Sequence, residues 1–241
     1  MASLSRRNLL KAAAVAPAAA VVPLRLLVDV DTARAAAPNY AQPPERFLTT
    51  AEVSFVEAAV ARIIPADELG PGAKEAGVAD FIDRQLAGPY GRAEAWYMQG
   101  PWRHGEKEQG YQLKLTPAHL YRAAIADIDA HARKEHGDKT FAQLDAKIQD
   151  AMLHSLEKGD LELPHASADA FFDMLVQNTV EGFLADPMYG GNRDFIGWKL
   201  IGFPGPRYNY VAEIERHGTR YDMPFVSIGG RDAGVRKSGA S

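Results

Sequence analysis

Apolar residues recur at helical spacing between residues 53 and 64, with polar residues and alanines filling most positions between them. Steps of three and four residues place such side chains on one face of a helix. Thr49 and Glu52 have the spacing of a capping box, in which each side chain accepts a hydrogen bond from the backbone N–H of the other residue. Pro65 disfavours helical backbone in the residue before it. The pattern therefore predicts a helix that begins after Thr49 and ends before Pro65.

Four further stretches show the helical period, and most of them lie between residues that favour helix ends. A Ser or Thr at the start accepts a hydrogen bond from a free backbone N–H, and a Gly at the end adopts the left-handed conformation that closes a helix. Strand-like alternation is sparse and no internal repeat is visible, so we expect a single all-α domain with long ordered loops. The four stretches are Val78 to Leu86, Thr116-Pro117 to Gly137, Thr140 to Gly159, and Ser167 to Phe183.

Long connections separate some of these helices. Residues 65–77 are rich in Gly and Pro and predict a loop. Residues 91–114 carry several aromatic and basic side chains, including Trp102, and we expect an ordered irregular loop with a helical part around Ala93 to Gln99. The segment after Pro206 is short and mixed, and no element is assigned to it.

The most unusual stretch runs from Glu181 to Pro206, where large aromatic residues alternate with glycines. Exposed loops gain nothing from apolar side chains, so this one must lie against its own core or against another protein. Both readings stay open, because internal packing and interface anchoring select the same residue types. We take the stretch as a candidate docking surface. Its candidate contact residues, with Trp102 in support, are Tyr189, Asn192, Arg193, Phe195, Trp198 and Phe203.

The composition excludes several classes of chemistry. The 241 residues carry a formal net charge of −4, which gives no basic stripe for a nucleic acid. The chain has no cysteine, so disulfides, thiolate catalysis, iron–sulfur ligation and covalent c-type haem attachment are excluded on it. No nucleotide-binding glycine fingerprint and no paired-histidine zinc motif is present. We therefore expect no cofactor on this chain.

The N-terminus predicts an export signal. Arg6 and Arg7 precede a weakly hydrophobic Ala/Val-rich segment, and Ala-Arg-Ala ends at Ala35. This order matches a twin-arginine leader cleaved between Ala35 and Ala36. A membrane anchor is the alternative, but two prolines and Arg25 interrupt the roughly 20 apolar residues that a span needs. The expected organisation is a leader over 1–35, a linker over 36–46, the helical domain over 47–229 and a disordered tail over 230–241.

Only a few polar residues of the chain are candidates for catalysis. None of the histidines has another at the i, i+4 spacing of metal-binding helices. His131 and His136 are five residues apart, and we expect them to face different sides. His104 lies in the aromatic loop beside Arg103, and Asp186 and Asp194 flank the Gly190-Gly191 turn. An independent periplasmic enzyme would have to use these residues, but caps and surface roles are the expected ones.

The run ADPMYGGNRDFIGWKLIGFPGP, behind a twin-arginine leader, resembles the small (gamma) subunit of gluconate 2-dehydrogenase, the subunit 3 family. The resemblance extends from about Phe47 to Arg231. It implies a periplasmic dehydrogenase complex in which a large FAD-binding flavoprotein oxidises a sugar acid and a multi-haem cytochrome c subunit carries electrons to ubiquinone. The small subunit escorts and stabilises the flavoprotein without a redox centre, so no catalytic residue is transferred.

The resemblance also implies the partners and the compartment. We expect the chain to bind the FAD-binding large subunit, the cytochrome c subunit and the twin-arginine translocase, with FAD and c-type haem on the partner subunits. We expect it in the periplasm, in contact with the inner membrane only through the complex. Two alternatives stay open, which are the small subunit of a related sugar or polyol dehydrogenase and an independent exported sugar-binding protein.

Overall fold

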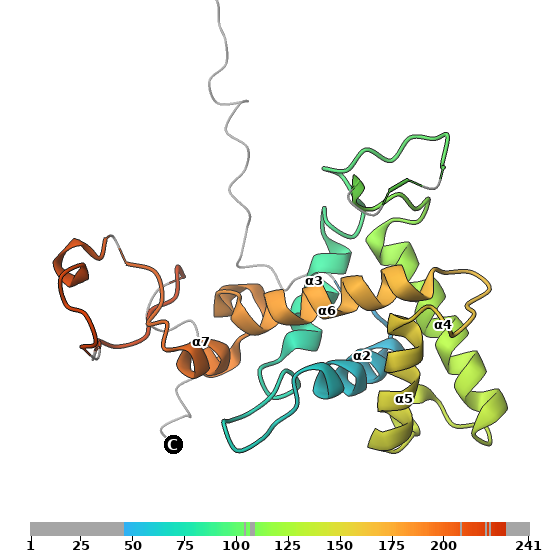
Figure 1. The fold of residues 1–241 in the computed structure, drawn as a ribbon, viewed down its shortest axis with the longest axis horizontal. Helices are drawn as coiled ribbons and strands as arrows, with labels where there is room; N and C mark the ends of the chain where they lie inside the picture. Colours follow the sequence, from blue (N-terminus) through green and yellow to red (C-terminus); the bar gives the residue numbers. More distant parts are fainter. Residues whose placement is uncertain are drawn as a thin grey trace, which may run out of the picture. The chain divides into compact units, whose positions relative to one another are not determined.

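In the computed structural model the described residues are 46–103, 105–106, 109–207, 209–219, 221 and 223–229. This part of the chain is helical, as expected, and it also contains an isolated β-bridge between Asp67 and Gly70. Figure 1 shows the order of the elements. The α-helices are α2 (Thr50–Ile63), α3 (Val78–Ala87), α4 (Pro117–Glu135), α5 (Ala146–Glu157), α6 (Ala168–Leu184) and α7 (Ile196–Ile201). The 3-10 helices are η2 (Phe141–Gln143), η3 (Pro187–Tyr189), η4 (Arg193–Phe195) and η5 (Val211–Glu213).

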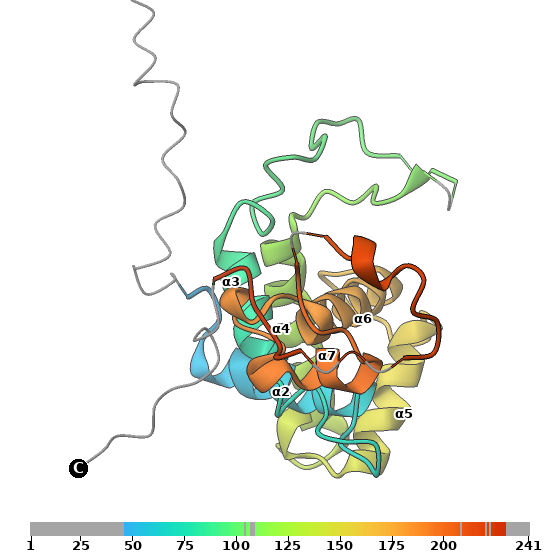
Figure 2. The same ribbon diagram turned by 90° about the vertical axis from the view of Figure 1, so that its left-hand side faces the viewer.

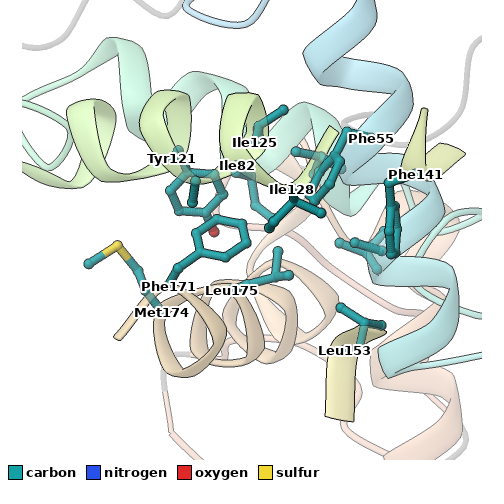
Figure 3. Close-up of a cluster of buried hydrophobic side chains, with 14 of the residues drawn as sticks. Phe55, Ile82, Tyr121, Ile125, Ile128, Phe141, Leu153, Phe171, Met174 and Leu175 are labelled. Carbon is teal, nitrogen blue, oxygen red and sulfur yellow. The ribbon is translucent and has the colours of Figure 1, made fainter. Parts of the chain in front are cut away.

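Helix α6 is the centre of the fold, because α2, α3, α4, α5 and α7 all contact it (Figure 1). Its inward face carries Phe171 and Leu175, both fully buried. In Figure 3 the Phe171 ring lies beside Tyr121 of α4, and the two ring centroids are 5.3 Å apart in an edge-on arrangement. Phe55 of α2 joins the same cluster and packs against Phe141 at 4.7 Å. Burial of such side chains stabilises the fold by roughly 1.5–3 kcal/mol each.

Two polar side chains buried in this core, Asp83 and Asn178, are hydrogen-bonded. Asp83 of α3 accepts hydrogen bonds from the backbone N–H groups of Phe47 and Leu48, each at 2.8 Å, and forms an ion pair with Arg46. Asn178 of α6 donates to the Tyr121 hydroxyl at 3.0 Å. Burial raises the pKa of the Tyr121 phenol, so it stays neutral and serves as an acceptor. Asp83 therefore ties the start of the described chain to α3, and Asn178 ties α6 to α4.

The predicted helix starts at Thr49 and Thr116 are confirmed. Thr49 and Glu52 form both hydrogen bonds of a capping box. Thr116 accepts from the backbone N–H of His119, with Pro117 as the first helical residue. The short helix expected over 78–86 is α3, and Ser167 directly precedes α6, as expected.

Three sequence expectations were wrong. Thr140 starts only the 3-10 turn η2, and α5 begins five residues later, where the Asp145 side chain accepts from the N–H of Ile148. This break lets Gln149 donate to the buried Phe141 carbonyl at 3.0 Å. Residues around Ala93 form turns, because Ala93 has a left-handed backbone with φ of 55°. The stretch after Asp186 contains α7 and two 3-10 helices instead of one irregular loop.

Replacing Thr49 by alanine is expected to lower the free energy of unfolding by about 1 kcal/mol, because the N–H of Glu52 loses its side-chain acceptor. Urea denaturation of the two proteins measures the difference. Thr50→Ala is the matched control, since Thr50 lies within the helix and no described hydrogen bond uses its hydroxyl. Equal losses for the two variants would contradict a role of the capping box.

Candidate docking surface at the end of helix α6

The chain turns back at the end of α6, and the buried Asp186 carboxylate organises the turn. One oxygen accepts from the backbone N–H of Met188 at 3.0 Å and from the Ser227 hydroxyl at 2.6 Å. The other accepts from the backbone N–H of Ile228 at 2.7 Å. Asp186 thus caps η3 and also holds the returning C-terminal segment. These hydrogen bonds give Asp186 a structural role as a cap. A cap is one of the roles expected for Asp186, which precedes the Gly190-Gly191 turn.

Asn192 connects the end of α6 to the start of α7. It is fully buried and has a left-handed backbone with φ of 45°. Its amide nitrogen donates to the Ala185 carbonyl at 2.8 Å, and its amide oxygen accepts from the backbone N–H of Gly197 at 2.8 Å. Because a buried amide is costly unless it is hydrogen-bonded, this geometry fixes the angle at which α7 leaves the turn.

Two glycines allow α7 and its preceding turn to lie directly on the backbone of α6. A Cβ atom at Gly191 would stand 2.1 Å from the Gly182 carbonyl oxygen, and one at Gly197 would stand 2.0 Å from the Phe183 carbonyl oxygen. Both distances are far below van der Waals contact. The glycines between the aromatics are therefore needed for this backbone packing.

The aromatic residues of the stretch pack on one another. The Phe195 ring stacks on Trp198 at 5.6 Å and on Phe225 at 5.7 Å, and Trp198 meets Phe203 edge-on at 5.0 Å. The Trp198 indole N–H donates to the Leu184 carbonyl at 2.7 Å. Trp198 is 4% exposed and Phe195 is 8% exposed. These two rings form a small aromatic core between α7, the end of α6 and the returning segment.

The structure divides the candidate contact residues into two groups. Asn192, Phe195 and Trp198 are buried within this chain, so any effect they have on a partner must act through the surface they support. Tyr189 and Phe203 are 38% and 37% exposed. Arg193 is also exposed, and its backbone N–H donates to the Ala76 carbonyl at 2.9 Å. Their contact with a partner stays a prediction.

Sequence reasoning missed four exposed apolar residues on the adjoining helices. Val180 and Leu184 lie on α6, and Leu200 and Ile201 lie on α7. Helices α6 and α7 contact each other, and Figure 2 shows them from the end where α7 lies. Val180 and Leu184 are four residues apart on α6 and therefore lie on one side of the helix, outside its buried face. This spacing could have indicated a second apolar face from the sequence. We call the following six residues the α6–α7 apolar surface: Val180, Leu184, Tyr189, Leu200, Ile201 and Phe203.

Trp102 lies on a different element, the loop between α3 and α4. Trp96 closes the base of this loop, with its ring 5.8 Å from Tyr90 and 5.1 Å from Tyr111. Trp102 itself is partly exposed, and Tyr97 is strongly exposed. The neighbouring His104 lies outside the described residues. The loop is thus anchored at its base and presents two aromatic side chains to the surroundings.

The base of this loop makes a pH-dependent contribution to stability. Burial raises the pKa of the Tyr111 phenol to about 12, and its hydroxyl donates to the Leu115 carbonyl at 2.6 Å. The folded state therefore keeps a proton that the unfolded chain loses above about pH 10. The stabilisation is complete below that pH and is lost as the pH rises toward 12. The Tyr111→Phe variant should show a smaller loss of stability over this window in thermal melts, and identical pH profiles would refute the assignment.

Within the described residues, no group of three His, Asp or Glu side chains is close enough to hold a metal ion. Asp194 is exposed and has a left-handed backbone with φ of 55° at the kink before α7. The Asp127 carboxylate accepts from the backbone N–H of His165 at 2.8 Å, and the two side chains also meet at 2.8 Å. These contacts account for Asp127 and His165 as a structural pair between α4 and the segment before α6.

Two protein-family models match the chain. Residues 50–205 match the model described as gluconate 2-dehydrogenase subunit 3. The chain belongs to this family. Residues 3–23 match the signal sequence of the twin-arginine translocation pathway, which indicates export across the cytoplasmic membrane and includes Arg6 and Arg7. Comparisons with curated proteins and with solved structures found no match.

The subunit 3 match begins at the first residue of α2 and ends at Gly205, after α7. It therefore includes the whole α6–α7 apolar surface and the buried residues that support it. The leader, the expected cleavage position at Ala35 and Ala36, and the expected tail from residue 230 lie outside the described residues. No helix in the described part of this family member is long and apolar enough to cross a bilayer.

Proposed function

We propose that this chain is the small, non-catalytic subunit of an exported dehydrogenase complex in which a separate FAD-binding flavoprotein oxidises a sugar acid. The family assignment and the twin-arginine leader support this role. The twin-arginine route carries folded proteins, which suits a complex whose FAD is loaded before export. The chain binds the folded flavoprotein in the cytoplasm, supplies its export signal and stays bound as a stabilising subunit.

In this proposal FAD and c-type haem belong to the partner subunits. The finished complex lies in the periplasm, where a cytochrome c subunit accepts the electrons and holds the complex at the inner membrane. The absence of cysteine on this chain agrees with that division, because covalent attachment of c-type haem requires cysteine. The substrate class is taken from the family name, and a related sugar or polyol is the alternative.

The observation that carries the proposal is the α6–α7 apolar surface. Exposed apolar side chains are normal when scattered, but several on two contacting helices are typical of a protein–protein interface. Leu200 and Ile201 are adjacent in α7 and are 48% and 59% exposed. The rigid aromatic core beneath them keeps α7 in place, which lowers the entropy lost on binding. The flavoprotein is the partner proposed for this surface.

The test is a double variant, Leu200→Glu with Ile201→Glu, co-expressed with the flavoprotein. Both side chains are exposed, so the melting temperature of the isolated chain should hardly change. Two carboxylates buried in an apolar interface should reduce the co-purified flavoprotein by at least about tenfold.

Leu69→Glu is the matched control, because Leu69 is a strongly exposed leucine in the loop between α2 and α3. This control should recover the flavoprotein at the wild-type level. Wild-type recovery with the α7 double variant would remove this surface from the proposal.

A further inference from the structure

A groove of about 440 Å³ lies away from the α6–α7 apolar surface, along α5 and the C-terminal end of α4. Its apolar wall is formed by Ile148, Ala151 and Met152 of α5, with Leu161 from the following segment. The volume is within the range of small-molecule sites in proteins, which are mostly apolar with a few polar groups. Neither the family match nor the proposed function gives this groove a role.

The polar lining of the groove is mainly basic. His131, His136 and Lys147 line it, and in the described part of the chain none of these three side chains takes part in a hydrogen bond or ion pair. Asp145, the one acidic residue in the lining, already accepts from the backbone N–H of Ile148 at 3.1 Å as the cap of α5. The Ser155 hydroxyl donates to the Ala151 carbonyl at 3.0 Å.

The expectation that His131 and His136 face different sides was wrong, since both line this groove. The reason is local. His136 lies just past the last residue of α4 and has a non-helical backbone with φ of −130°, so the helical period no longer fixes its direction. A sequence pattern of i, i+5 in a continuous helix could not have shown this pairing.

The lining decides between kinds of ligand. A metal ion is disfavoured, because a protein site normally needs three or four ligands and no third His, Asp or Glu completes one in the described residues. A polyhydroxylated acid has no apolar surface that could cover the apolar wall of the groove. A carboxylate with an apolar body matches both parts, since its charge complements the Lys147 ammonium, the imidazole N–H groups can donate to it, and its chain covers the wall.

We propose that the α4–α5 groove binds a small organic monocarboxylate with an apolar body. The Lys147 ammonium pairs with the carboxylate, His131 and His136 donate to it, and the apolar body lies against Ile148 and Met152. This site is independent of the flavoprotein partner, so its failure would leave the proposed function unaffected.

Isothermal titration of the purified exported chain with octanoate tests the proposal. Octanoate should bind saturably with one site. Octan-1-ol, which keeps the chain without the charge, and gluconate, which keeps the charge without the apolar body, should each bind at least about tenfold more weakly. Binding of all three with equal strength, or no saturable octanoate binding, would overturn the proposal.

The variant arm uses Lys147→Met, which keeps the aliphatic stem and removes the charge. Its octanoate affinity should fall by about tenfold. Lys134→Met is the control, because it removes the same charge from an exposed position of α4 that does not line the groove. Equal affinity in the two variants would exclude the pairing.

A spectroscopic readout locates the ligand without relying on a variant. In NMR spectra of histidine-labelled protein, octanoate should shift the imidazole signals of His131 and His136. The signal of His119, whose ring contacts Thr116 at the opposite end of α4, should stay in place. Shifts at His119 with none at the other two would place the ligand elsewhere and refute the site.

Discussion

Alanine in place of Gly197 is expected to detach α7 from α6 and to lower the free energy of unfolding by about 2–4 kcal/mol. The added Cβ would stand 2.0 Å from the Phe183 carbonyl oxygen, which belongs to the backbone of the central helix and cannot move aside. Helix α7 must shift instead. The shift would break the hydrogen bond from Trp198 to Leu184 and the one from Gly197 to Asn192.

Urea denaturation followed by tryptophan fluorescence measures this loss, and near-ultraviolet circular dichroism reports the packing of Trp198. Gly88→Ala is the matched control. Gly88 has a φ of −92°, and its added Cβ would meet the Arg84 carbonyl oxygen at 3.4 Å, which is ordinary contact. Its effect should stay within about 0.5 kcal/mol. Similar losses of unfolding free energy for both variants would show that the close approach at Gly197 does not cause the loss.

The same variant connects stability to function. Because α7 carries Leu200 and Ile201, its displacement should also reduce the binding of the flavoprotein. The exposed double variant described above should reduce binding while the chain stays folded. Together the two variants distinguish a surface that contacts the partner from a core that holds the surface in place.

Local chemistry made some elements predictable from the sequence. Thr49 with Glu52 and Thr116 with Pro117 form their caps within one helical turn, so the helix starts could be read from adjacent residues. The start of α5 could not, because Thr140 and Asp145 are both suitable caps. A contact between Gln149 and the buried Phe141 carbonyl accompanies the later start. Tertiary packing overrode the local signal there.

The aromatic stretch shows a different limit. Phe195 and Trp198 could be core or interface from their residue types alone, and only their burial separates the two readings. Part of their enclosure comes from a segment distant in sequence, since Phe225 stacks on Phe195 and Ser227 of the same segment donates to Asp186 across 41 positions. No short-range pattern indicates such a contact. Leu200 and Ile201 were missed for the same reason, because their exposure depends on how α7 lies on α6.

Replacing both Arg6 and Arg7 by lysine is expected to keep this chain in the cytoplasm. The two arginines lie within the matched signal sequence, and lysine keeps the charge while losing the planar guanidinium and its fixed set of donors. The domain over residues 50–205 is untouched, so the retained chain should still fold and bind the flavoprotein. Fractionation followed by immunoblotting measures the compartment of this chain.

The most direct test of the account is the compartment of the flavoprotein in cells that carry this double lysine variant. The flavoprotein is expressed there without a leader of its own, and a matched strain carries the wild-type small subunit. The account predicts an FAD-loaded flavoprotein in the periplasm with the wild-type subunit, and the same flavoprotein confined to the cytoplasm with the variant. Equal amounts of periplasmic flavoprotein in the two strains would contradict the proposal that this chain carries its partner across the membrane.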